Sequence, residues 1–201
     1  MYFCFVKKIL LIDNYDSFVY NIVHLVKRVT NNDIEICYND RIPFPRLGEF
    51  SHIILSPGPG LPQEAGDLLK VVEYCKETHS ILGVCLGHQA IACSFGGKLI
   101  NLKHPLHGHK SLLKLSDNSD PVLGKIHDEK GSFPKIEVGL YHSWAVNASS
   151  LPCDLTVGSV NETGIPMTIF HEKFKIYGVQ FHPESVISKY GAEIMSEWMH
   201  W

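Results

Sequence analysis

The sequence predicts an α/β fold: a doubly wound, mainly parallel central sheet with flanking helices and an additional small antiparallel sheet. Three features of the chain indicate this fold. Apolar runs of strand length alternate with segments of helical apolar spacing through the first half. The strand runs end in polar or glycine-rich loops, as they do where helices connect parallel strands. After Gly97 the segments become shorter and alternate between apolar and polar residues, which is typical of mixed or antiparallel strands.

The first half opens with Lys8–Asp13, a near-continuous apolar run suited to a central parallel strand that is buried on both faces. The polar turn that follows offers Asp16 or Ser17 as a helix cap, and the apolar spacing predicts that helix over Phe18–Val29. The later elements of this half are a strand over Ile34–Tyr38, a proline-broken connection over Asp40–Phe50, a strand over His52–Ser56, a helix over Leu68–Cys75, a strand over Ile81–Val84 and a helix over Leu86–Phe95.

The second half supplies strands that extend the central sheet or pack against it. Between them, Asn118–Pro134 is polar and irregular, so we expect a mobile surface loop or lid there. The predicted strands cover Leu99–Leu102, Ser111–Leu115, Glu137–Tyr141, Asp154–Val160, Met167–His171 and Lys175–Gln180.

Length and composition indicate one domain spanning residues 1–201. Apolar residues make up 45% of the chain and charged residues 19%, which is ordinary for a soluble globular protein. The net charge of −3 argues against a nucleic-acid surface, because few cations are available to neutralise phosphates. The six cysteines are scattered without a C-x-x-C pair, which favours a reducing cytoplasm. We expect Met1–Val6 to be a short extension, since it is too short to span a membrane and is not built like a secretory signal.

The segment Gly83-Val84-Cys85-Leu86-Gly87 has the form of a nucleophile elbow. In such an elbow, a sharp turn from strand to helix lifts the central side chain out of the sheet, and the flanking glycines relieve backbone crowding. A cysteine there is exposed, strained and close to the positive end of a helix, which favours the thiolate. Cys85 is therefore a candidate nucleophile. A buried structural cysteine also fits this segment, so partners elsewhere must decide.

A second loop, Pro57-Gly58-Pro59-Gly60, follows the strand that precedes this one. In a doubly wound sheet both loops lie at the carboxyl edge, where such sheets bind ligands, so we expect them to face each other. The prolines stiffen the loop, while the glycines allow close backbone approach and present their N–H groups. Alone, the segment is an ordinary tight turn. Beside Cys85 it is better interpreted as part of a ligand site.

Partners for Cys85 come late in the chain, where the last predicted strand runs into Phe181-His182-Pro183-Glu184-Ser185. In extended chain His182 and Glu184 point the same way, because side chains alternate along a strand. Glu184 then accepts a hydrogen bond from one ring nitrogen of His182, and the other nitrogen exchanges a proton with Cys85 and a leaving group. The alternative is an ordinary strand exit without a catalytic role.

Three histidines in the segment HPLHGHK, which are His104, His107 and His109, invite a metal interpretation. Histidines on one flexible loop with no adjacent carboxylate are better explained as solvated or substrate-edge residues. We expect neither a metal nor an organic cofactor in this chain.

The motifs SPGPG, GVCLGHQ, YHS and GVQFHPES occur in that order, and together they resemble the triad class of glutamine amidotransferase domains. LLIDNYDSF, LSPGPGLPQEAG and GVCLGHQAIA are most similar to the small glutaminase subunit that serves chorismate-using synthases. The resemblance covers Lys8–Trp198 and implies the class I glutamine amidotransferase fold. It also implies that the chain hydrolyses L-glutamine and delivers ammonia to a large synthase subunit.

The resemblance also implies a role for individual residues. Cys85 is implied as the nucleophile, His182 as the general acid and base, and Glu184 as the partner that orients His182. The backbone N–H groups of Gly58 and Leu86 are implied as the oxyanion hole, in which each donor is worth about 3 kcal/mol in other hydrolases. The positions implied to hold glutamine are Gly58, Pro59, Gly60, Gln89, Ser143 and Trp144, the last two largely through backbone groups.

Members of this family bind the synthase subunit through the face that carries the active site. The loops DNYDSF and HPLHGHKS are therefore candidates for the interface, and assembly is expected to complete the catalytic geometry. The chain departs from the family at Leu140, where Arg is frequent, at Trp144, where Leu is frequent, and in the sequence His107-Gly108-His109-Lys110-Ser111. These departures lie outside the triad and bear on docking.

The YHSW form of the substrate loop favours anthranilate synthase, on the path to tryptophan, as the partner. The alternative is aminodeoxychorismate synthase, on the path to folate, or a subunit that serves both. A second interpretation is a noncatalytic binding or regulatory module of the same fold. The presence of Cys85, His182 and Glu184 disfavours it. A cysteine peptidase on a related elbow fold is a third, and Gln89 and the PGPG loop favour a small amide substrate over a peptide.

Overall fold

The computed structural model describes residues 8–116, 120–128 and 131–201. The extension predicted over Met1–Val6 lies outside these residues, and so does Cys4. The cysteines in the described ranges are all free. No helix in these ranges is long and apolar enough to cross a membrane.

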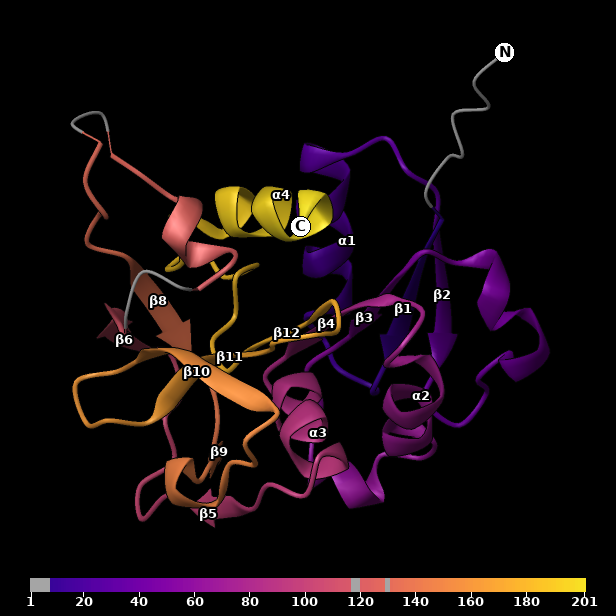
Figure 1. The fold of residues 1–201 in the computed structure, drawn as a ribbon, viewed down its shortest axis with the longest axis horizontal. Coiled ribbons are helices and arrows are strands. Elements are labelled where there is room, and N and C mark those ends of the chain that lie inside the picture. The colour runs from indigo at the N-terminus through magenta and orange to yellow at the C-terminus, as the bar shows by residue number, and fades with distance from the viewer. Residues whose placement is uncertain (1–7, 117–119, 129–130) are drawn as a thin grey trace.

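One mixed sheet of eight strands runs through the centre of the described chain (Figure 1). Its first five strands are parallel to one another and its last three are joined antiparallel, which confirms the predicted mainly parallel sheet. From one edge to the other the strands are β2 (Ile34–Tyr38), β1 (Ile9–Asp13), β3 (His52–Leu55), β4 (Ser80–Val84), β12 (Ile176–Val179), β11 (Pro166–His171), β10 (Leu155–Val160) and β7 (Lys114–Leu115).

Strand β1 shows why the strands of the first half are continuous apolar runs. Ile9 and Leu11 pack into the hydrophobic cluster on one face of the sheet, and Leu10 and Ile12 pack into the cluster on the other. Because side chains alternate along a strand, a strand covered on both faces must be apolar at every position. All four side chains are fully buried, as the sequence predicted for this segment.

Helices cover both faces of the sheet (Figure 1). On one face lie α1 (Val19–Val29) and α4 (Gly191–His200), and on the other lie α2 (Leu68–Cys75) and α3 (Leu86–Ser94). The predictions for α1, α2 and α3 are confirmed to within one residue. Helix α4 was not predicted, although it buries Trp198 completely.

The antiparallel part is more divided than the sequence predicted. Strand β5 (Leu99–Asn101) pairs with β9 (Trp144–Val146), and β6 (His109–Leu112) pairs with β8 (Glu137–Leu140), so two small sheets stand beside the central one. The single strand predicted over Ser111–Leu115 is wrong. It divides at the buried Leu113, after which the chain joins the central sheet as β7. Short 3-10 helices span Phe44–Glu49, Pro62–Glu64, Leu123–Lys125 and Ala148–Ser150.

Residues 118–119 and 129–130 of the surface loop expected over Asn118–Pro134 lie outside the described ranges. Residues 120–126 of this stretch are instead anchored to the core. Val122, Leu123 and Ile126 are buried in the same hydrophobic cluster as helix α4. The expectation is wrong for these residues because three apolar side chains fix an otherwise polar stretch. Their spacing matches neither a strand nor a long helix, so the sequence pattern did not reveal them.

Asp120 ties this segment to the central sheet. Its carboxylate is 2% exposed and accepts hydrogen bonds from the N–H groups of Val122 and Leu123, at 3.0 and 2.7 Å. It also accepts hydrogen bonds from the hydroxyls of Thr168 at 2.8 Å and Tyr177 at 2.9 Å. Burial raises the pKa of Asp120, while its hydrogen-bond donors oppose that shift. A buried carboxylate with four donors is a strong structural anchor.

We predict that Asp120→Asn lowers the free energy of unfolding by about 3 kcal/mol, because an amide cannot accept from all four donors and leaves buried groups unpaired. Tyr177→Phe removes one donor and keeps the carboxylate satisfied, so it costs about 1 kcal/mol. Urea unfolding of both variants measures these losses, with the exposed Asp33→Asn as the control. Equal stability of Asp120→Asn and the control would contradict the anchor.

Candidate active site

The turn between β4 and α3 has the backbone of the predicted elbow. Cys85 adopts φ 51° and ψ −99°, outside the regions that non-glycine residues favour. Such strain costs on the order of 1–3 kcal/mol and persists only where the surrounding structure enforces it. Here the Cys85 N–H donates to the carbonyl of Val179 in β12 at 2.8 Å, and the Cys85 carbonyl accepts from the N–H of Gln89 at 3.1 Å.

The two glycines of the elbow allow helix α3 to approach the sheet closely. A Cβ on Gly83 would overlap the backbone of Gly87. A Cβ on Gly87 would overlap the carbonyl of Leu55 in β3. Side chains at these positions would therefore push the helix away from the sheet and release the turn at Cys85.

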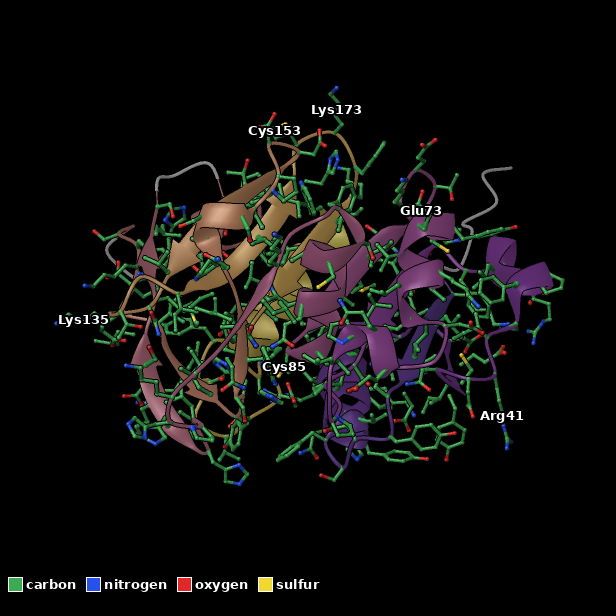
Figure 2. All side chains as sticks on the ribbon, turned by 90° about the horizontal axis from the view of Figure 1, so that it is seen from below. Arg41, Glu73, Cys85, Lys135, Cys153 and Lys173 are labelled. Carbon is green, nitrogen blue, oxygen red and sulfur yellow. The ribbon has the colours of Figure 1, made fainter. Side chains whose placement is uncertain are left out.

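Cys85 lines a cavity of about 270 Å³. Figure 2 labels this residue near the centre of the view. The expectation that the elbow exposes this side chain is wrong, because the residue is only 6% exposed and is reached through the cavity. All the positions implied to hold glutamine or its oxyanion line the same cavity. The full lining is Gly58, Pro59, Gly60, Cys85, Leu86, Gln89, Tyr141, His142, Ser143 and Trp144.

His182 and Glu184 are not in the cavity lining but form a buried pair next to Cys85. The distance from His182 Nδ1 to Glu184 Oε1 is 2.7 Å, and the two side chains are 3% and 0% exposed. The predicted hydrogen bond is present, but the extended geometry proposed for it is wrong. Strand β12 ends at Val179, and the Ser185 N–H donates to the His182 carbonyl at 3.2 Å, which closes a β-turn. Proline is favoured at the second position of such a turn.

The charge of His182 depends on its two neighbours. Burial lowers the pKa of His182, but Cys85 and Glu184 together outweigh burial and raise it to about 10. An ionised Glu184 only accepts hydrogen bonds, so His182 Nδ1 carries the hydrogen. The other ring nitrogen, Nε2, is buried and has no hydrogen-bond partner within the described ranges. The raised pKa keeps His182 protonated near neutral pH, and Nε2 is placed to exchange a proton with the Cys85 sulfur.

Two aromatic rings that sequence reasoning missed hold the imidazole. Phe18, next to the start of α1, packs edge-on to His182 with ring centroids 5.6 Å apart. Tyr141, just after β8, does the same at 5.0 Å, and its hydroxyl lies 3.2 Å from Ser185 Oγ. The sequence placed Phe18 only as a helix start, and nothing in the local pattern shows that it contacts a residue 164 positions later.

The loops after β1 and β3 are joined beside the elbow. The backbone N–H of Asn14 donates to Ser56 Oγ at 2.9 Å, and Asn14 Nδ2 donates to the Ser56 carbonyl at 2.8 Å. A Cβ on Gly58 would lie within 2.8 Å of Leu86 Cδ2 and 2.5 Å of Asn14 Cβ. Only glycine fits there, so the PGPG loop packs against the elbow, as predicted.

Two further histidines near the cavity are buried with no ion-pair partner among the described residues, and no local pattern predicts either environment. His142 lines the cavity and donates from Nδ1 to the Trp144 carbonyl at 2.9 Å, and burial lowers its pKa to about 4. His88, on α3, packs against Gly178 of β12 and is fully buried, which lowers its pKa to about 3. Both are neutral at pH 7.

No histidine of the segment HPLHGHK lies against Cys85, His182 or Glu184 in the contacts of the described residues. The ring of His107 packs edge-on against Tyr141 at 5.6 Å, whereas His104 and His109 line a second cavity. Over the residues that the structure describes, no three His, Cys, Asp or Glu side chains are grouped to hold a metal ion.

Residues 10–200 match the family model for glutamine amidotransferase class-I, and the chain belongs to this family. The bifunctional protein TrpGD of Thermotoga maritima is 39% identical over 201 residues, which cover 96% of this chain and 32% of that protein. The aminodeoxychorismate/anthranilate synthase component 2 of Bacillus subtilis is 36% identical over 193 residues, which cover 93% of each chain.

A solved structure supports the fold. A protein of Thermoplasma acidophilum, assigned provisionally as one component of a GMP synthase, superimposes with a TM-score of 0.81 at 27% identity. The superposition covers 97% of this chain and 93% of that one. The α/β fold predicted from the sequence is thus confirmed by both the strand order and a known relative.

We predict a loss of stability in acid because His88 is buried neutral. Above pH 6.5, the ordinary pKa of histidine, His88 is neutral in both the folded and the unfolded chain, and the folded state keeps its full stability. As the pH falls from 6.5 toward 3, the unfolded chain takes up a proton on His88 that the folded chain does not, so stability is lost. His88→Leu has no such group, so its stability loss between pH 6 and pH 4 is smaller than that of the wild type by about 2 kcal/mol. Urea unfolding at both pH values measures this, with the exposed His24→Gln as control. Parallel pH profiles for His88→Leu and wild type would refute it.

Proposed function

We propose that this chain is a glutaminase that hydrolyses L-glutamine through a cysteine thioester and delivers ammonia to the large subunit of a chorismate-using synthase. The observation that carries the proposal is the buried His182–Glu184 pair next to Cys85, beside a cavity lined by all the implied glutamine positions. We further propose that residues 1–201 act as one domain in the cytoplasm.

In the proposed mechanism the Cys85 thiolate attacks the carboxamide carbon of glutamine. His182 Nε2 gives its proton to the leaving nitrogen as the C–N bond breaks, which releases ammonia and leaves a γ-glutamyl thioester. The neutral His182 then takes a proton from water, whose oxygen attacks the thioester carbon. The C–S bond breaks, glutamate leaves, and the thiolate and imidazolium are restored. Glu184 holds Nδ1 and stabilises the imidazolium in both steps.

The oxyanion formed at each attack needs donors in a fixed position. We assign this role to the backbone N–H groups of Gly58 and Leu86, which are brought to one cavity by the contact between the PGPG loop and the elbow. Donors that are already in place cost no reorganisation during the reaction, and each is worth about 3 kcal/mol.

Gln89 is suited to recognise an amide or ammonium group of the substrate. Both hydrogens of its Nε2 are in use, toward the Trp144 carbonyl at 2.7 Å and toward Gln180 Oε1 at 3.2 Å. Its oxygen therefore remains to accept a hydrogen bond from glutamine. The Trp144 carbonyl accepts from both Gln89 and His142, so its lone pairs are occupied and its role is to fix Gln89.

The pathway that we propose first is anthranilate synthesis, which the YHSW loop favours. The alternative is aminodeoxychorismate synthesis, or a subunit shared by both, and the Bacillus subtilis relative whose name includes both synthases supports sharing. A noncatalytic module fits less well, because Cys85, His182 and Glu184 are all present. A cysteine peptidase fits less well, because the cavity of about 270 Å³ suits a small amide.

The loops proposed as the interface contact the rings that hold the catalytic histidine. Phe18 belongs to DNYDSF and packs on His182, while His107 of HPLHGHKS packs on Tyr141, which also packs on His182. A large subunit docked on these loops would therefore act on the orientation of the imidazole. We expect the glutaminase activity of the free chain to be low for this reason.

We predict that Cys85→Ser lowers glutamine-dependent product formation by at least about a thousandfold, because the thiolate nucleophile is lost. Synthesis from free ammonia by the large subunit is retained, since that reaction bypasses this chain. Steady-state assays of the assembled complex with each nitrogen source measure both, and Cys93→Ser is the matched control. Glutamine-supported synthesis in the Cys85 variant would show that another group is the nucleophile.

The pathway is decided by mixing the purified chain with the large subunit of anthranilate synthase and, separately, with that of aminodeoxychorismate synthase from the same source. Chorismate and glutamine are supplied without free ammonia. We expect product with the anthranilate partner. Product with the other partner alone would move the assignment to folate synthesis, and product with both would establish a shared subunit.

A further inference from the structure

A chain of hydrogen bonds connects the wall of the cavity to the sulfur of Cys85. Gln89 on α3 donates from Nε2 to the Trp144 carbonyl of β9 at 2.7 Å and to Gln180 Oε1 at 3.2 Å. Gln180, the residue after β12, donates from Nε2 to Cys85 Sγ at 3.7 Å. Residues from three segments, which are the elbow with α3, β9 and the end of β12, thus share one polar network that includes the candidate nucleophile.

The orientation of both amides follows from the network itself. A backbone carbonyl only accepts, so the group of Gln89 that faces Trp144 must be the NH₂ group. That NH₂ group also faces Gln180, which must present its oxygen in return. The NH₂ group of Gln180 is therefore directed at Cys85 Sγ, and the contact is a donated hydrogen bond to sulfur.

Gln180 is fixed and shielded from water. Its side chain is fully buried, and its backbone N–H donates to the Met167 carbonyl in β11 at 2.8 Å. The preceding residue, Val179, accepts the N–H of Cys85 itself at 2.8 Å. The end of β12 thus carries Gln180 and also binds the strained turn at Cys85. A hydrogen bond to a charged partner is strongest where water is excluded.

We propose that Gln180 is a positioning residue that holds Cys85 Sγ in place and stabilises its negative charge through the hydrogen bond from Nε2. This role rests on the proposed function of Cys85 as the nucleophile. The charge on sulfur is present before attack and returns when the thioester breaks, so the hydrogen bond acts on both steps. Gln89, the proposed substrate contact, orients the Gln180 amide. It therefore also directs Gln180 Nε2 toward the sulfur of Cys85.

The test compares Gln180→Met with the wild type, since methionine keeps the length of the side chain and lacks the donor. Glutaminase kinetics are measured in the complex with the large subunit. In parallel, alkylation of Cys85 by iodoacetamide is followed over a pH series by mass spectrometry of its peptide. The control is Gln63→Met, because the exposed Gln63 amide stands beside the noncatalytic Cys93.

We expect Gln180→Met to lower kcat by about 10-fold to 100-fold with KM changed less than about twofold, as loss of a hydrogen bond to a charged group predicts. The Cys85 alkylation rate at pH 7 falls about tenfold and its pH profile moves to higher pH. Gln63→Met leaves both unchanged. An alkylation profile of Gln180→Met that superimposes on the wild type overturns the proposal.

A second variant covers the case in which Gln180→Met does not fold. Gln89→Met leaves Gln180 and Cys85 in place but removes the group that orients the amide, so Cys85 alkylation slows by about threefold. Unchanged alkylation in that variant also overturns the proposal. A wild-type complex without glutaminase activity would instead refute the proposed function, which keeps the two failures distinct.

Discussion

The strained turn at Cys85 is the constraint on which the site depends. A residue with a side chain keeps φ 51° only if its neighbours leave no alternative. Those neighbours are the close contact of α3 with the sheet at Gly83 and Gly87, and the hydrogen bond from Cys85 to Val179. The same turn brings Leu86 against Gly58, so the proposed nucleophile and the proposed oxyanion donors are placed by one local geometry.

Electrostatics distinguish three buried histidines that have similar exposure. Burial lowers the pKa of His88, His142 and His182 alike. Of these three, only His182 has a raised pKa, because its interactions with Cys85 and Glu184 outweigh burial. The charge of each imidazole is therefore decided by its partner and not by its depth in the protein. This is how one small region holds a proton donor beside neutral rings.

The rest of the fold fixes the two walls of the cavity relative to each other. The parallel half carries the elbow and the PGPG loop, and β9 with its flanking residues supplies the opposite wall. Polar side chains join these parts, since Gln89 and His142 converge on the Trp144 carbonyl. Further away, Asp120 fastens the segment that precedes β8 to the strands of the mixed sheet. Satisfied buried polar groups thus fix parts that apolar packing alone would leave less specific.

The sequence by itself determined the alternating α/β order, the elbow and the PGPG loop, and it made Cys85, His182 and Glu184 the candidate triad. The first three features rest on periodicity and turn chemistry within a few residues, as in the apolar run of β1 and the spacing of Gly83 and Gly87. The candidate triad rests on the resemblance of motifs spread along the chain. The tertiary structure decided the burial of Cys85, the anchoring of Asp120 and the contact of Gln180 with the sulfur. Asp120 and Tyr177 are 57 residues apart, and Cys85 and Gln180 are 95 apart. The partners of a buried polar group come from distant segments, so no local pattern encodes them.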